Sequence, residues 1–186
     1  MEEVISSKIK YQKEVIPQMM EKYGLKNIYQ VPIIEKIVVN LGIGKILSQA
    51  KDKEKMLKEI EKDISLITGQ KPSLRKSRKA ISAFKLRKGM PVGLKVTLRG
   101  QRMYDFLDRL INIYLPRVRD FRGLSLNLFD EQGNLNIGFK DLSPFPEIGL
   151  KKLIFGLEVS IVIRRAKNKE QAIEFLRLLG LPLKKK

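Results

Sequence analysis

The sequence predicts an α+β fold: a single domain with an antiparallel sheet, helices packed on one face of the sheet, and the other face exposed. Two patterns lead to this prediction. Apolar residues recur at helical spacing in residues 51–68 and 101–115, whereas β-branched residues gather in the short stretches 34–41 and 157–163. In addition, no internal repeat and no long linker divides the 186 residues, a length that suits one domain with a substantial core.

The first third of the chain is predicted to form a helix, a strand and a second helix. Residues 5–23 have near-helical apolar spacing, and Pro17 within them predicts a kink or a late start of the helix. Residues 34–41 (IEKIVVNL) predict a strand. Residues 51–68 predict an amphipathic helix, and Gly69 follows it where a C-terminal cap belongs.

The middle of the chain is predicted to contain two strands and a helix. Residues 80–86 (AISAFKL) predict a strand at the end of a basic loop, and residues 94–98 predict another, with a turn at 89–93 between them. A second amphipathic helix follows over 101–115. It should stop before Pro116, because a residue that precedes proline is biased away from helical geometry.

The last third is predicted to contain a hairpin, a strand and a helix. Residues 124–139 are typical of a hairpin, and the alternation of residues 157–163 indicates the final strand. Asn168 and Gln171 have the spacing of a capping box at the start of the closing helix. The predicted organisation is a single domain over 1–186, with a projecting basic loop at about 71–89, a loop and hairpin region at 115–150, and a terminal helix at 168–180.

Charge is distributed unevenly along the chain. Residues 64–104 include eleven Lys and Arg and no Asp or Glu, and so supply eleven of the formal +18 charges. Such a block repels itself in a folded chain, which suggests that a polyanion neutralises it in use. A polyphosphate is the leading candidate, because closely spaced phosphates release counterions when cations bind them. The alternative is a solvated basic face that maintains solubility.

The residue types present give catalysis little support. The chain has no Cys and no His, which excludes thiol nucleophiles, disulfides, imidazole catalysis and zinc sites built on these residues. Asp105 and Asp108 could present paired carboxylates to a metal in a phosphoryl-transfer or nuclease enzyme, or could be ordinary partners on a polar helix face. Residues 42–44 (GIG) lack the rest of a phosphate-binding motif and favour a turn. We therefore predict no enzyme and no cofactor.

A basic module for anionic membrane surfaces is a further alternative. It requires an amphipathic helix with lysines on its polar face, whereas the charge here lies mainly in predicted loop and strands. No apolar run approaches the ~18 residues of a membrane span. We expect no membrane partner.

Nucleic-acid recognition is better supported. Gln70 and Lys71 follow a predicted helix end, where a loop can approach a partner closely. Thr97 and Arg99 should point to one side of their strand, because strand side chains alternate with period two. Asn40 could lie on the same sheet face, or be a satisfied polar group at a strand end. The basic loop has a lone aromatic, so it favours tracking of phosphates and sugars over base stacking.

Three long strings closely resemble one known family. Residues 31–44 (VPIIEKIVVNLGIG), 68–100 (TGQKPSLRKSRKAISAFKLRKGMPVGLKVTLRG) and 115–125 (LPRVRDFRGLS) are similar to large-subunit ribosomal protein number five of the bacterial type. Residues 145–148 (FPEI) and the closing helix agree in order and spacing. The resemblance covers nearly the whole chain.

The resemblance implies a structural protein of the ribosome, in the bacterial cytoplasm or in an organelle. Its expected partners are 5S rRNA and neighbouring rRNA and proteins of the central protuberance, P-site tRNA, and a protein of the small-subunit head. The head protein is expected near 117–123 and the hairpin that follows. The residues implied as 5S rRNA contacts are Asn40, Gln70, Lys71, Thr97 and Arg99. Those implied at a tip that faces tRNA are Lys76, Ser77, Arg78 and Lys79.

The C-terminal third departs from that family. Residues 149–156 (GLKKLIFG) form a shorter segment, with Phe155 where relatives usually have Arg. Arg164 and Arg165 stand where small hydroxyl residues are common. These departures bear on the small-subunit contact and leave the implied 5S rRNA contacts unchanged.

Overall fold

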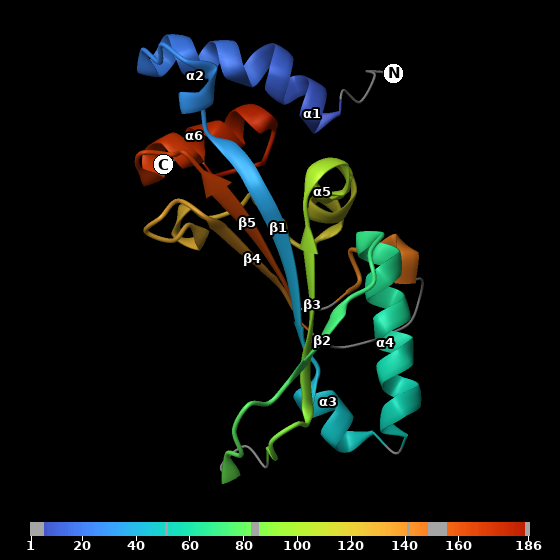
Figure 1. The fold of residues 1–186 in the computed structure, drawn as a ribbon. Coiled ribbons are helices and arrows are strands. Elements are labelled where there is room, and N and C mark those ends of the chain that lie inside the picture. Colours follow the sequence, from blue (N-terminus) through green and yellow to red (C-terminus); the bar gives the residue numbers. More distant parts are fainter. Residues whose placement is uncertain (1–5, 51, 83–85, 141, 149–155, 185–186) are drawn as a thin grey trace. The chain divides into compact units, whose positions relative to one another are not determined.

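The computed structural model describes residues 6–50, 52–82, 86–140, 142–148 and 156–184 (Figure 1). Five strands form one antiparallel sheet in the order β2-β3-β1-β5-β4, and the predicted α+β class is confirmed. The strands are β1 Ile33–Gly42, β2 Ser73–Lys76, β3 Pro91–Leu98, β4 Leu135–Phe139 and β5 Leu157–Arg164.

Helices of three types accompany the sheet. The α-helices are α1 Ser7–Lys10, α2 Ile16–Tyr23, α3 Gly44–Gln49, α4 Lys53–Thr68, α5 Gly100–Arg109 and α6 Lys169–Leu179. Two π-helical turns are η1 Tyr11–Val15 and η4 Leu110–Tyr114. The 3-10 turns are η2 Ile28–Gln30, η5 Leu115–Arg117, η6 Leu126–Leu128 and η7 Pro146–Ile148.

The chain forms two compact units. Unit 1 comprises Met1–Ile37, Arg99–Ile137 and Ser160–Lys186, and unit 2 comprises Val38–Leu98 and Gly138–Val159.

Unit 2 has a sheet with one covered and one open face. Leu94, Val96 and Leu98 of β3 are buried, whereas Lys95 and Thr97 between them remain partly accessible. Both α3 and α4 contact β3, and α4 presents a buried apolar stripe. The alternation of β3 therefore gives each face its own chemistry: apolar toward the helices, polar on the open side.

Unit 1 is built around aromatic and aliphatic side chains. Tyr11 meets Phe175 of α6 edge to face, with 6.0 Å between ring centroids, and Phe106 lies 6.1 Å from Tyr114. These rings are buried and join η1 to α6 and α5 to η4. The expected helix over 5–23 is observed as α1, η1 and α2, and the π-helical turn ends just before Pro17 in the first turn of α2.

The predicted caps of α4 and α6 are confirmed. Gly69 has φ +67° after α4, a left-handed conformation that glycine adopts without strain. The Asn168 side chain accepts a hydrogen bond from the Gln171 N–H at 2.9 Å. The reciprocal bond differs from a standard capping box, because the Gln171 side chain accepts from the N–H of Lys167, one residue earlier.

The prediction of a strand at 80–86 is wrong. Ile81 and Leu86 form only an isolated bridge, and residues 83–85 lie outside the described part of the chain. The strand is instead β2, where Ser73 pairs with Lys95 in β3. Residues 73–76 form the strand because they pair with β3, a long-range contact that local propensity does not encode.

Three further boundaries differ from the prediction. Helical turns continue through Pro116, which lies in the first turn of η5, where its missing N–H leaves no bond unmade. Strand β3 starts at Pro91 rather than at residue 94. The hairpin expected over 124–139 contributes β4, but its first arm contains η6 and only a bridge from Phe129 to Leu135. Helix α3 was not predicted.

Candidate nucleic-acid interface

Gln70 and Thr97 are brought together in unit 2. Gly69 ends α4, and the Gln70 side-chain amide then donates to the backbone carbonyl of Thr97 at 3.3 Å. The Thr68 hydroxyl donates to the Gln70 carbonyl at 2.9 Å and so holds the backbone of the same residue. The amide group keeps a second N–H donor and an acceptor oxygen with which it can bond a partner.

Asn40 is exposed near the end of β1, and its side-chain amide donates to Glu158 at 3.4 Å. The sequence left two alternatives for Asn40, a satisfied polar group at a strand end or a residue on an exposed sheet face. Both have support, because Asn40 has a hydrogen-bond partner and is accessible. Glu158 was not anticipated as a neighbour, although the alternation of β5 does place it on the exposed side of that strand. An acid at this position leaves the Asn40 side-chain oxygen as the acceptor available to a ligand.

Lys71 and Arg99 are both exposed. Lys71 directly follows Gln70, so it belongs to the same part of unit 2. Arg99 is the N-cap residue of α5 in unit 1, and its backbone is extended. The structure thus joins Gln70 to Thr97 by a hydrogen bond and leaves Arg99 as a separate exposed cation.

The expected tRNA-facing residues lie at and beyond the end of β2. Lys76 pairs with Pro91 after a register shift, and Lys76, Arg78 and Lys79 are exposed. Ser77 differs from them, because its hydroxyl donates to the Lys79 carbonyl at 2.6 Å and its N–H donates to the Met90 carbonyl at 2.8 Å. Ser77 therefore shapes the turn, while its neighbours present charge.

The sequence analysis did not identify three polar residues of the open face as candidate site residues: Ser73, Arg75 and Lys95. Ser73 lies opposite Lys95, and Arg75 lies opposite Gly93, so each pair shares one face of the sheet. The period-two pattern around Thr97 could have identified Lys95. Ser73 and Arg75 required the register between β2 and β3.

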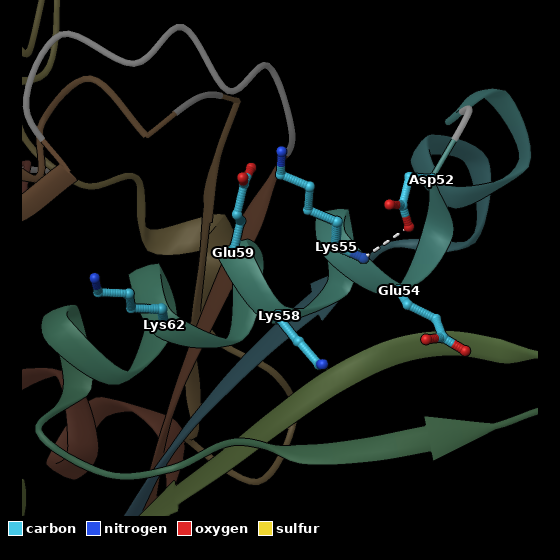
Figure 2. Close-up of a pocket in the computed structure, with 6 residues that line it drawn as sticks. All are labelled: Asp52, Glu54, Lys55, Lys58, Glu59 and Lys62. Carbon is cyan, nitrogen blue, oxygen red and sulfur yellow. Dashed lines mark hydrogen bonds between the residues drawn. The ribbon is translucent and has the colours of Figure 1, made fainter.

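The outer face of α4 carries a shallow hollow with a different character (Figure 2). Three acids and three lysines line it, and Figure 2 shows Lys55 and Glu59 extending to one side of the helix and Lys58 and Glu54 to the other. Opposite charges at helical spacing are ordinary solvated partners. Its lining residues are Asp52, Glu54, Lys55, Lys58, Glu59 and Lys62.

The candidate carboxylate pair has structural partners. Asp105 accepts from the Gln101 side chain at 2.8 Å. Asp108 accepts from the Ser7 N–H at 2.8 Å and from the hydroxyls of Ser6 and Ser7, so it caps the first helix from α5. Within the described ranges, no group of three or more metal-ligating side chains occurs. Among the same residues, no helix is long and apolar enough to cross a bilayer.

Comparison with known proteins gives two family matches and relatives that align over nearly the whole chain. The family described as ribosomal protein L5 matches residues 27–87, and the family described as its C-terminus matches residues 91–183. Large ribosomal subunit protein uL5 of Dictyoglomus turgidum is 54% identical over 178 residues, which is 95% of this chain and 97% of that protein. The protein of that name from Thermoanaerobacter sp. (strain X514) is 49% identical with the same coverage.

These relatives are structural proteins of the ribosome and not enzymes. Matches to both family halves and identity near one half over almost the whole length establish the relationship. The chain belongs to the ribosomal protein L5 family.

Proposed function

We propose that this chain, as a structural constituent of the large ribosomal subunit, binds 5S rRNA in the central protuberance. The residues proposed to contact it are Asn40, Gln70, Lys71 and Thr97 on the open face of unit 2, and, separately, Arg99 in unit 1. The observation that carries the proposal is the hydrogen bond from Gln70 to the Thr97 carbonyl, which ties two polar segments together next to the exposed Lys71. Family membership supports an RNA partner.

The chemistry of this face suits folded RNA. Amide, hydroxyl and carbonyl groups can bond sugar hydroxyls and base edges, and lysines neutralise phosphates. The exposed residues of β3 and its surroundings are polar rather than aromatic, so recognition by shape and hydrogen bonds is favoured over stacking in unit 2.

The β2–β3 connection is proposed to contact P-site tRNA. Lys76, Arg78 and Lys79 present three exposed cations there, and Ser77 orders the turn between them. Phosphate contacts of this kind fix position without reading sequence.

A third contact, to a small-subunit head protein, is proposed for residues 117–123 and the hairpin that follows. Arg117, Arg119 and Arg122 are exposed, and Asp120 between them has φ +53°. Planar guanidinium groups suit carboxylates of a protein partner.

The 5S assignment is tested by capture of RNA on the full chain, followed by sequencing of the bound species. We expect 5S rRNA to dominate. Gln70→Ala and Arg99→Ala should reduce its recovery, whereas Gln132→Ala, at an exposed hairpin turn in unit 1, should not. Recovery of another RNA as the dominant species would show that the open face serves a different ligand.

A further inference from the structure

An exposed aromatic side chain with an arginine over it lies in unit 1, and neither residue is among the RNA contacts proposed above. Tyr29 is 75% exposed and Ile28 is 55% exposed. The guanidinium carbon of Arg165 lies 5.7 Å from the centroid of the Tyr29 ring, within the range of a cation–π contact. Large apolar side chains with this much exposure need a reason when they adjoin one another.

The local backbone holds both partners in place. Tyr29 lies in η2, and its N–H donates to the side chain of Asn27 at 2.9 Å, which fixes the start of that turn. Arg165 follows the end of β5 with φ +70°, a left-handed conformation that side chains other than glycine rarely adopt. A strained backbone at an exposed arginine is typical of a functional position.

The surroundings of this pair are basic. Residues 25–34 contain Lys26 and no acid, and residues 160–169 contain four Lys and Arg and no acid. Arg164 is exposed beside Arg165 at the end of β5. Lys169 is used internally, because it donates to the Phe129 carbonyl at 2.8 Å. The patch therefore combines one accessible ring with cations, a charge pattern that favours a phosphate-bearing partner.

We propose that Tyr29 and Arg165 form a stacking site for one unpaired nucleobase of ribosomal RNA, with Arg164 on the flanking phosphate. A base can stack on an aromatic face or on a guanidinium plane, and unpaired bases are the usual targets of such platforms in RNA recognition. The patch goes beyond the proposed 5S and tRNA contacts. All three residues lie in unit 1, so the inference stands if the assignment of the open face in unit 2 fails.

The test uses the full chain assembled into large subunits, with Tyr29 replaced by photoreactive p-benzoylphenylalanine. We expect irradiation to give a cross-link to an unpaired nucleotide of ribosomal RNA, identified by sequencing. A cross-link only to protein would overturn the proposal in favour of a protein interface. Absence of any cross-link would overturn it as well, because the ring would then remain in solvent.

Variants separate stacking from charge. Tyr29→Ala should weaken binding of the full chain to large-subunit rRNA about five- to one-hundredfold, the range for loss of one stacked base, whereas Tyr29→Phe should stay within about twofold. Lys13→Ala, which removes an exposed cation of η1, is the charge control and should have little effect. Equal losses for Tyr29→Ala and Lys13→Ala would contradict a stacking site.

Arg165→Gly separates binding from stability. Glycine adopts the observed left-handed backbone without strain, so thermal stability should be unchanged or higher. RNA affinity should nevertheless fall about fivefold or more, because the guanidinium is lost. Unchanged affinity in this variant would show that Arg165 serves only to cover Tyr29.

Discussion

The Gln70 side chain donates to the backbone carbonyl of Thr97 at 3.3 Å and ties the segment that follows α4 to the end of β3, 27 positions along the chain. Both residues belong to the set implied for 5S rRNA binding. Because this bond joins two parts of the protein itself, part of the ordering cost of binding is met when the protein folds. A surface held in this way should bind RNA with little rearrangement.

Gln70→Glu should weaken 5S rRNA binding about tenfold. The carboxylate has nearly the same shape, but it cannot donate to the Thr97 carbonyl and it repels phosphates. Titration of 5S rRNA with purified protein measures the effect. The matched change Gln132→Glu adds the same charge at an exposed turn of unit 1, and an equal loss there would show that net charge alone explains the result.

The triple change of Lys76, Arg78 and Lys79 to Ala should spare 5S rRNA affinity and reduce tRNA binding to assembled subunits. These cations lie at the end of β2 and just after it. Gln70, by contrast, precedes β2, and Thr97 lies near the end of β3. Filter binding with each RNA provides the two measurements. If the affinity for 5S rRNA falls as much as in Gln70→Glu, the acid-free residues 64–104 are not divided between two RNAs as proposed.

Salt should weaken 5S binding steeply. If about six phosphates are neutralised, the logarithm of the association constant should fall against the logarithm of salt concentration with a slope of roughly −4 to −5. Lys71→Ala, at an exposed position next to Gln70, should reduce the magnitude of that slope by about one. An affinity that hardly depends on salt would contradict the proposed phosphate contacts.

Asp108→Ala should destabilise unit 1, whereas Asp105→Ala should not. Asp108 accepts from the N–H of Ser7 and from two hydroxyls, and so caps the first helix from a distant part of the chain. Loss of a cap costs about 1–2 kcal/mol. Urea unfolding compares the two variants. Asp105 is exposed and its carboxylate accepts from Gln101 one turn earlier on the same helix, so it is the natural control.

Stability should fall at alkaline pH. Burial raises the pKa of the Tyr104 hydroxyl above its ordinary value of 10.0. Burial likewise raises the pKa of Tyr11, with a further rise from Tyr104 and an opposing effect of Arg165. The folded state therefore favours the neutral phenols, so their contribution is complete below pH 10 and is lost as pH rises above it. Unfolding free energies between pH 8 and about 11 check this, and Tyr104→Phe should flatten the decline.

Local patterns were sufficient for much of the architecture. Gly69 after the apolar helical stretch 51–68 identified the end of α4, and its φ is positive. Such caps depend on a backbone conformation that few other residues adopt, so the signal lies within a few positions of the helix end. The alternation in β3 likewise placed Thr97 opposite the buried face.

Pairing between distant segments could not be predicted from local sequence patterns. Strand β2 is short and basic, and it becomes a strand because Leu74 lies opposite Leu94 of β3. The neighbours Asn40 and Glu158 are 118 positions apart, and nothing near either residue indicates the other. Sheet register depends on which segments meet in the folded chain, and single residues do not specify it.

The sequence by itself determined the α+β class, the family, and an acid-free basic window that calls for a polyanion. Those properties depend on periodicity, composition and strings of adjacent residues. Only the tertiary structure decided that Gln70 holds Thr97, that Asp108 caps the first helix, and that Arg165 covers Tyr29. Each of these is a contact between segments far apart in the chain, so it exists only once packing of the core has brought them together.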